Sequence, residues 1–230
     1  MKYLIAFLLL LFCIETNAQT NWFNTYTDSV ALIRDANTIV TQFVSKVKGV
    51  DPSFDPQVLV VKNTTPYLIF INDSTVNLPF WMEVSADQKG FFSTVAGGQK
   101  EGREVFGLFF NGFYLAHELG HLLALTAHKV YTNAYQKEYD ANVIGILYWR
   151  AAGKDKQLLT CYQWAKKMLL VLKNPAPGNE DLKTYLTEHY DELVADPYKF
   201  GYIQFSQFVE IYENRTLSDF HAFLKTYINK

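Results

Sequence analysis

The sequence is poor in cysteine, and this excludes a fold that depends on disulfide bonds. Only two of its 230 residues are cysteines, Cys13 and Cys161. Cys13 lies in an N-terminal segment that we expect to be removed, and the one remaining thiol cannot form an internal disulfide. Cys161 has apolar neighbours, which predicts a buried side chain rather than a nucleophile. A hydrophobic core must therefore hold the fold, and 49% apolar residues are enough to form one.

An excess of charge of either sign is also missing. The formal net charge is -2, from 21 basic and 23 acidic residues spread along the chain. Proteins that bind nucleic acid carry a basic surface that neutralises phosphates. We therefore expect no nucleic-acid partner.

Long apolar runs are confined to the N-terminus. Lys2 precedes an apolar run from Tyr3 to Ile14, and residues 16–18 are small, as at a signal-peptidase site. The run has about a dozen residues, fewer than the roughly 20 that span a bilayer, although an uncleaved anchor is the alternative. We predict a signal peptide at residues 1–18 and one mature domain at residues 19–230. The mature protein would be secreted or periplasmic, with no stable membrane anchor.

The pattern of apolar residues predicts strands in the first half of the chain. Helical spacing from Trp22 to about Val47 indicates a long N-terminal helix, which we expect to belong to the fold rather than to a removable pro-segment. Short apolar runs predict strands at Val58–Val61 and Tyr67–Ile71, with one or two more between Thr75 and Val95. Residues 97–102 are polar and rich in glycine, and are expected to form a loop beside a cleft.

The second half of the chain is predicted to be helical. The apolar spacing indicates helices at about residues 105–128, 134–152, 156–172, 181–194, 205–213 and 218–227. Strands first and helices afterwards predict an α+β domain, with helices packed on one face of a small, mainly antiparallel sheet.

The motif His117-Glu118-Leu119-Gly120-His121 lies in the middle of one predicted helix. Residues four apart lie one above the other on a helix, so the imidazoles of His117 and His121 can reach one metal ion. Glu118 then lies beside the metal, where a bound water would be. Imidazole nitrogen suits zinc, and a catalytic zinc usually takes three protein ligands and one water.

A third metal ligand is needed after this motif. A metzincin would have glycine at position 124 and histidine at position 127, but Ala124 and Ala127 are found there. On the next predicted helix Glu138 and Asn142 share a face, while Asp140 points about 200° away. We predict Glu138 as the third ligand, and Asp140 is the alternative.

Residues 112–145 resemble the gluzincin metallopeptidases, in particular the HtpX-like and ImmA/IrrE-like groups. In those groups a helix with the pattern Glu-x-x-Ala-Asp/Asn follows HExxH and supplies the third ligand, as Glu138-Tyr139-Asp140-Ala141-Asn142 would here. The resemblance implies a zincin-like fold and a Zn²⁺ cofactor held by His117, His121 and Glu138. It implies that Glu118 is the general base.

The resemblance has further implications around this core. Asn142 takes the place of a residue that hydrogen-bonds a ligand histidine, where many relatives have aspartate; an uncharged amide should raise the basicity of the ligand less. An oxyanion stabiliser is expected from the C-terminal half, with His221 as our first candidate and His189 and Tyr202 as the others. The substrate backbone is expected to pair with an exposed sheet edge, for which we chose Phe91–Val95.

Together these residues predict a secreted zinc metallopeptidase acting on a peptide or protein substrate. Glu118 would take a proton from a zinc-activated water and deliver it to the leaving amine. The alternative is a non-catalytic zinc-binding domain of the same fold that binds a partner. A fourth protein ligand, from His128 or Asp140, would favour that alternative, because closed zinc sites are structural. An enzyme for another substrate is also consistent with such a site.

Overall fold

Three short strands form the only sheet within residues 21–62 and 68–229, which are the residues that the computed structural model describes. They are β1 (Leu59–Lys62), β2 (Phe70–Asn72) and β3 (Thr75–Leu78). β3 is central, with β1 paired parallel to it and β2 antiparallel. Because β2 and β3 form a hairpin, β1 takes the other edge of β3. The sheet is therefore mixed, and not mainly antiparallel as predicted.

Helices make up most of the described chain, so the α+β class is confirmed. The α-helices are α1 (Ser29–Lys48), α2 (Ala86–Ala96), α3 (Gln99–Leu108), α4 (Tyr114–Thr126), α5 (Ala134–Ala151), α6 (Asp155–Met168), α7 (Leu182–Glu188), α8 (Tyr190–Ala195), α9 (Pro197–Glu213) and α10 (Phe220–Ile228), with a 3-10 turn at Trp81–Glu83. None of the described helices is long and apolar enough to cross a bilayer. The predicted signal peptide, residues 1–18, lies outside the described residues.

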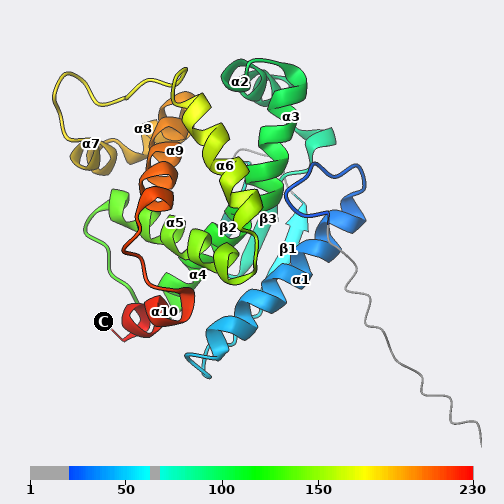
Figure 1. Cartoon of the computed structure of the whole chain (residues 1–230), viewed down its shortest axis with the longest axis vertical. Coiled ribbons are helices and arrows are strands. Elements are labelled where there is room, and N and C mark those ends of the chain that lie inside the picture. Colours follow the sequence, from blue (N-terminus) through cyan, green and yellow to red (C-terminus); the bar gives the residue numbers. More distant parts are fainter. Residues whose placement is uncertain (1–20, 63–67, 230) are drawn as a thin grey trace, which may run out of the picture.

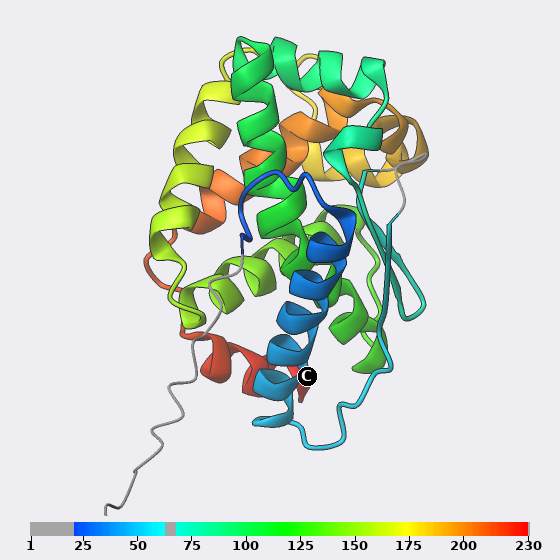
Figure 2. The same cartoon turned by 90° about the vertical axis from the view of Figure 1, so that its right-hand side faces the viewer.

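The helices cover one face of the sheet. α1 packs against β1, and α4 packs against β2 and β3. Figure 2 shows the strands along one side of the molecule, with the helices gathered beside them. α5 packs along α4, and α9 lies against both α5 and α6 (Figure 1). The two helices with the predicted metal ligands, α4 and α5, are therefore enclosed between the sheet and α9.

The segment 86–96 is helical, so the predicted edge strand Phe91–Val95 is wrong. Ser85 caps the start of α2 by accepting a hydrogen bond from the backbone N–H of Gln88, and Gly97 ends the helix with φ 87°. Capping at both ends favours a helix, and Gly90 inside it costs only about 1 kcal/mol. The predicted loop at residues 97–102 shrinks to Gly97 and Gly98, because α3 starts at residue 99.

A π-helical turn, Phe109–Phe113, joins α3 to α4 where the sequence predicted one continuous helix. Asn111 leaves helical geometry there (φ -108°, ψ 26°), and its side-chain amide donates to the carbonyl of Pro79. The N-terminal segment stabilises the turn, since the indole of Trp22 donates to the carbonyl of Gly112 at 3.0 Å. Such turns re-aim the helix that follows, and this one sets the direction of α4.

The aromatic core lies directly behind the start of α4. Phe113 is fully buried and packs edge-on against Phe208 of α9, with ring centroids 4.7 Å apart. Trp149 of α5 donates its indole N–H to the carbonyl of Phe113 at 3.1 Å. These contacts join α4, α5 and α9 one helical turn before His117, so the segment with the predicted ligands packs on a rigid core.

Candidate metal centre

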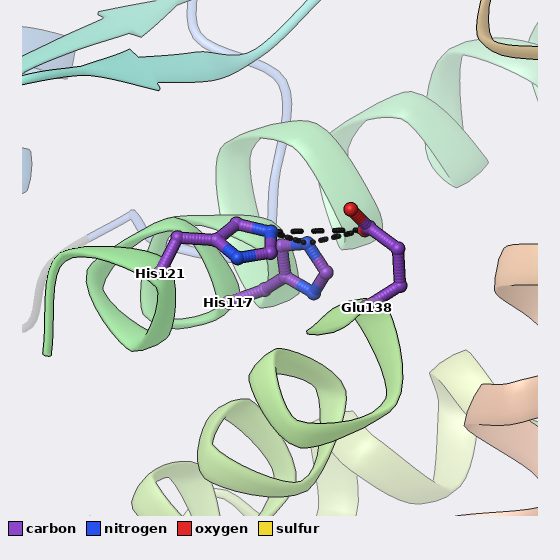
Figure 3. A group of neighbouring side chains, drawn as sticks. All are labelled: His117, His121 and Glu138. Carbon is purple, nitrogen blue, oxygen red and sulfur yellow. Dashed lines mark hydrogen bonds and ion pairs between the residues drawn. The ribbon is translucent and has the colours of Figure 1, made fainter. Parts of the chain in front are cut away.

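Three donor atoms converge between α4 and α5 (Figure 3). The Nε2 atoms of His117 and His121 are 3.1 Å apart. Oε2 of Glu138 lies 3.4 Å from the first and 3.7 Å from the second. Ligands about 2.0–2.1 Å from a tetrahedral zinc are about 3.3 Å from one another, so these separations fit one ion. The predicted His-His-Glu group is thus present, and it can hold a metal.

Helix geometry and helix packing each position part of this group. His117 and His121 are one turn apart on the same face of α4. Glu138 reaches them because Asn133 starts α5, its side chain accepting from the backbone N–H of Gln136, so that Glu138 falls in the second turn. Gly120 lets the two helices approach: a Cβ there would lie 3.2 Å from the Cα of Ala141. Gly120 therefore allows a close contact between α4 and α5.

Replacing Gly120 by Ala is expected to destabilise the protein by about 1–3 kcal/mol, because the added methyl group overpacks the contact between α4 and α5. The added Cβ would also lie 3.3 Å from the Cβ of Ile144. Urea unfolding measures the effect. Gly90→Ala in α2 is the matched control, since a Cβ at Gly90 meets no atom within 4 Å, and it should be neutral or stabilising. Equal stability of both variants would contradict the close-packing role of Gly120.

Glu138 is buried yet held in its ionised form. It is 3% exposed. Burial by itself would raise its pKa, but the neighbouring imidazoles of His121 and His117 hold the pKa well below its usual range. Its Oε1 accepts from the hydroxyl of Tyr190 at 3.1 Å, and its Oε2 accepts from the amide of Gln204 at 2.8 Å. A metal ligand must be deprotonated, and this environment meets that requirement.

Glu118 lies in the same cavity but outside the donor group. It is 8% exposed. Burial raises its pKa to about 7; the charge of His117 opposes this rise, Glu138 adds to it, and a hydrogen bond from the backbone of Ile71 opposes it. A carboxylate with a pKa near neutrality can both accept and return a proton at physiological pH.

The cavity in front of the donor group has a volume of about 860 Å³. His117, His121, Glu138 and Glu118 line it together with mostly apolar side chains of β2, α2, the π-helical turn, α4 and α9, among them Ile71, Phe91, Phe110, Leu122, Phe200 and Phe205. A volume of this size with a few convergent polar groups is typical of a ligand site.

The other sequence candidates lie elsewhere. His221 is exposed on α10 and His189 is exposed between α7 and α8, and neither lines the cavity. Tyr202 packs on the hydrophobic core and does not line the cavity either. The hydroxyl that reaches the donor group is that of Tyr190, which the sequence analysis missed. No local pattern marks Tyr190, because its position depends on how α8 packs on α5 and α9.

The alternative ligands do not reach the donor group. Asp140 accepts hydrogen bonds from the hydroxyl of Tyr131 at 3.0 Å and from the amide of Gln136 at 2.6 Å. His128 is exposed just after α4, with φ 52°. Within the described part of the chain, no fourth His, Cys, Asp or Glu joins the three donors.

The predicted contact of Asn142 with a ligand histidine is present. Its Oδ1 lies 2.9 Å from Nδ1 of His117. Its amide donates to the side-chain oxygens of Gln204 and Gln207, at 3.0 and 2.9 Å. Both glutamines are buried on α9. No motif spacing in the sequence marks these glutamines, because they lie more than 60 residues beyond Asn142.

The family resemblance covers only residues 112–145, which carry the three donors. A fold and a metal site of this kind do not by themselves define a family or a reaction. The proposal of a bound metal therefore depends on the donor geometry alone. Comparison with protein-family models, with curated proteins and with solved structures gives no match to this chain.

Proposed function

We propose that the protein is a zinc-dependent metallopeptidase. The observation that carries this proposal is the convergence of three buried donors, His117, His121 and Glu138, with the carboxylate of Glu118 beside them in a large cavity. Three protein ligands are the number typical of a catalytic zinc, which keeps a position for water. This number supports an enzyme over the alternative of a closed, structural zinc site in a partner-binding domain.

The residues that line the cavity have different roles in the proposed peptide hydrolysis. When bound, zinc supplies Lewis acidity and lowers the pKa of a coordinated water. Glu118 takes a proton from the attacking water and returns it to the leaving amine. Tyr190, whose hydroxyl reaches Oε1 of Glu138 at 3.1 Å, is our candidate for turning that hydroxyl toward negative charge on the substrate oxygen. It replaces His221 as our candidate for this role.

Strand β2 is the candidate for holding the substrate backbone. It is an edge strand of the sheet and packs against α4. Residues 68–71, which include the start of β2, line the cavity. An extended peptide can add to such an edge through main-chain hydrogen bonds. The mostly apolar lining favours substrates with large apolar side chains near the cleaved bond. The N-terminal sequence pattern supports action outside the cytoplasm.

Removing the metal is expected to abolish peptide cleavage, and adding zinc back should restore it, because the three donors supply no nucleophile of their own. The measurement is the zinc content of the mature protein by mass spectrometry, together with cleavage of a broad peptide pool before and after chelation. About one zinc per chain with zinc-dependent cleavage supports the proposal. Bound zinc without cleavage of any peptide would favour the non-catalytic domain.

A further inference from the structure

Helix α9 contributes two buried glutamines to the metal centre. Gln204 is 4% exposed and Gln207 is fully buried. Both accept a hydrogen bond from the amide of Asn142. Gln204 also donates to Oε2 of Glu138 at 2.8 Å, and Gln207 donates to the backbone carbonyl of Tyr135 at 3.1 Å. Each amide thus uses both its oxygen and its nitrogen, as buried polar groups require.

The donor and the acceptor of each hydrogen bond can be assigned from the last group in the series, because that group can act in only one way. The carbonyl of Tyr135 can only accept, so Gln207 turns its nitrogen to it and its oxygen to Asn142. Asn142 must then present its nitrogen to α9 and its oxygen to His117. His117 consequently carries its proton on Nδ1, and the lone pair of its Nε2 faces the other two donors.

The hydrogen bonds of Gln204 run in the same direction. Its nitrogen donates to Oε2 of Glu138, and its oxygen accepts from the amide of Asn142. The hydrogen bonds therefore run from His117 to Asn142, from Asn142 to Gln204, and from Gln204 to Glu138. Gln204 is the residue that joins a ligand of α4 to a ligand of α5.

We propose that Gln204 is a positioning residue that couples His117 to Glu138 through Asn142 and so sets the affinity of the site for its metal. The inference that this metal is zinc rests on the proposed function. Because Gln204 acts through the ligands, it needs no contact with the substrate. Helix α9 then controls metal binding from outside the HExxH and Glu-x-x-Ala-Asn segments.

The same geometry explains why asparagine suits position 142. A carboxylate there would still accept from His117, but it would face the side-chain oxygens of Gln204 and Gln207. Turning either glutamine would direct its oxygen at Glu138 or at the carbonyl of Tyr135. Neither arrangement satisfies every group, and an acceptor buried against another acceptor is costly.

The test compares Gln204→Met with Gln207→Met in the mature protein. Both replace a buried glutamine of α9 that bonds Asn142, but only the first removes a bond to a metal ligand. We expect Gln204→Met to weaken zinc binding by about 10–100-fold and Gln207→Met to weaken it much less. Zinc affinity is measured by competition with a chelator, and urea unfolding of the zinc-free proteins measures the structural cost of each change. Equal losses of zinc affinity in the two variants would overturn the proposal.

Two further measurements test the direction of the hydrogen bonds. Asn142→Asp, which introduces the residue common in the groups that residues 112–145 resemble, is expected to weaken zinc binding; tighter binding would overturn the proposal. Nitrogen-15 NMR of the zinc-free protein should show the proton of neutral His117 on Nδ1, and a proton on Nε2 would overturn it. The NMR result decides the direction even if the protein binds no zinc. Zinc binding without peptide cleavage would refute only the proposed peptidase activity.

Discussion

Peptide cleavage is expected to fall by about 10²–10⁴-fold in Glu118→Gln, while zinc stays bound. Glutamine has the shape of glutamate but cannot take a proton from water at neutral pH. Glu118 is not one of the three converging donors, so its loss should leave the metal in place. The measurement is kcat/KM for a cleaved peptide together with the zinc content of both proteins.

Asp140→Asn is the matched control for this variant. It removes another partly buried carboxylate, two residues from Glu138, whose oxygens bond Tyr131 and Gln136 rather than the donor group. Its activity should stay close to wild type. If Glu118→Gln lost its zinc together with its activity, Glu118 would be a ligand and not a base. If it retained most of its activity, the general base would lie elsewhere.

The same substitution is expected to stabilise the zinc-free protein at alkaline pH. Burial raises the pKa of Glu118 from its ordinary value of 4.5 to about 7. A raised pKa in the native state means that stability is full below the unfolded value and is lost as the pH rises through the native value. At about 1.4 kcal/mol per tenfold change in acid dissociation, the loss for wild type is about 3 kcal/mol above pH ~8. The glutamine of Glu118→Gln does not ionise, so the variant does not lose this stability.

Urea unfolding of the zinc-free proteins at several pH values measures this difference. Wild type and Glu118→Gln should have similar stability near pH ~4.5, and the variant should become the more stable one between about pH 5 and pH 8. Titrating groups that do not interact with Glu118 are shared, so they cancel in the difference. A difference that does not change with pH would show that Glu118 ionises in the native protein without penalty. A site residue that lowers stability is a common cost of function.

The predicted helices agree with the structure unevenly, since α9 begins at Pro197, eight residues before its predicted start at residue 205. Apolar spacing located α5 within one residue, because an amphipathic helix repeats its pattern over many residues. The run Phe91–Val95 is too short for its period to separate strand from helix, and the caps at Ser85 and Gly97 decided for a helix. The π-helical turn before α4 had no sequence signal, because Asn111 leaves helical geometry in contact with the distant Pro79.

The sequence by itself predicted His117 and His121 as donors with Glu118 beside them, and Glu138 as the third donor with Asp140 as the alternative. The four-residue spacing places His117 and His121 on one face of a helix, and the short connection to Glu138 brings the next helix back beside them. Only the tertiary structure decided what orients these donors. Tyr190, Gln204 and Gln207 lie 52 to 72 residues from their partners in α5, and neither helix periodicity nor motif spacing extends across such a distance. The packing of α8 and α9 on α5 places them there.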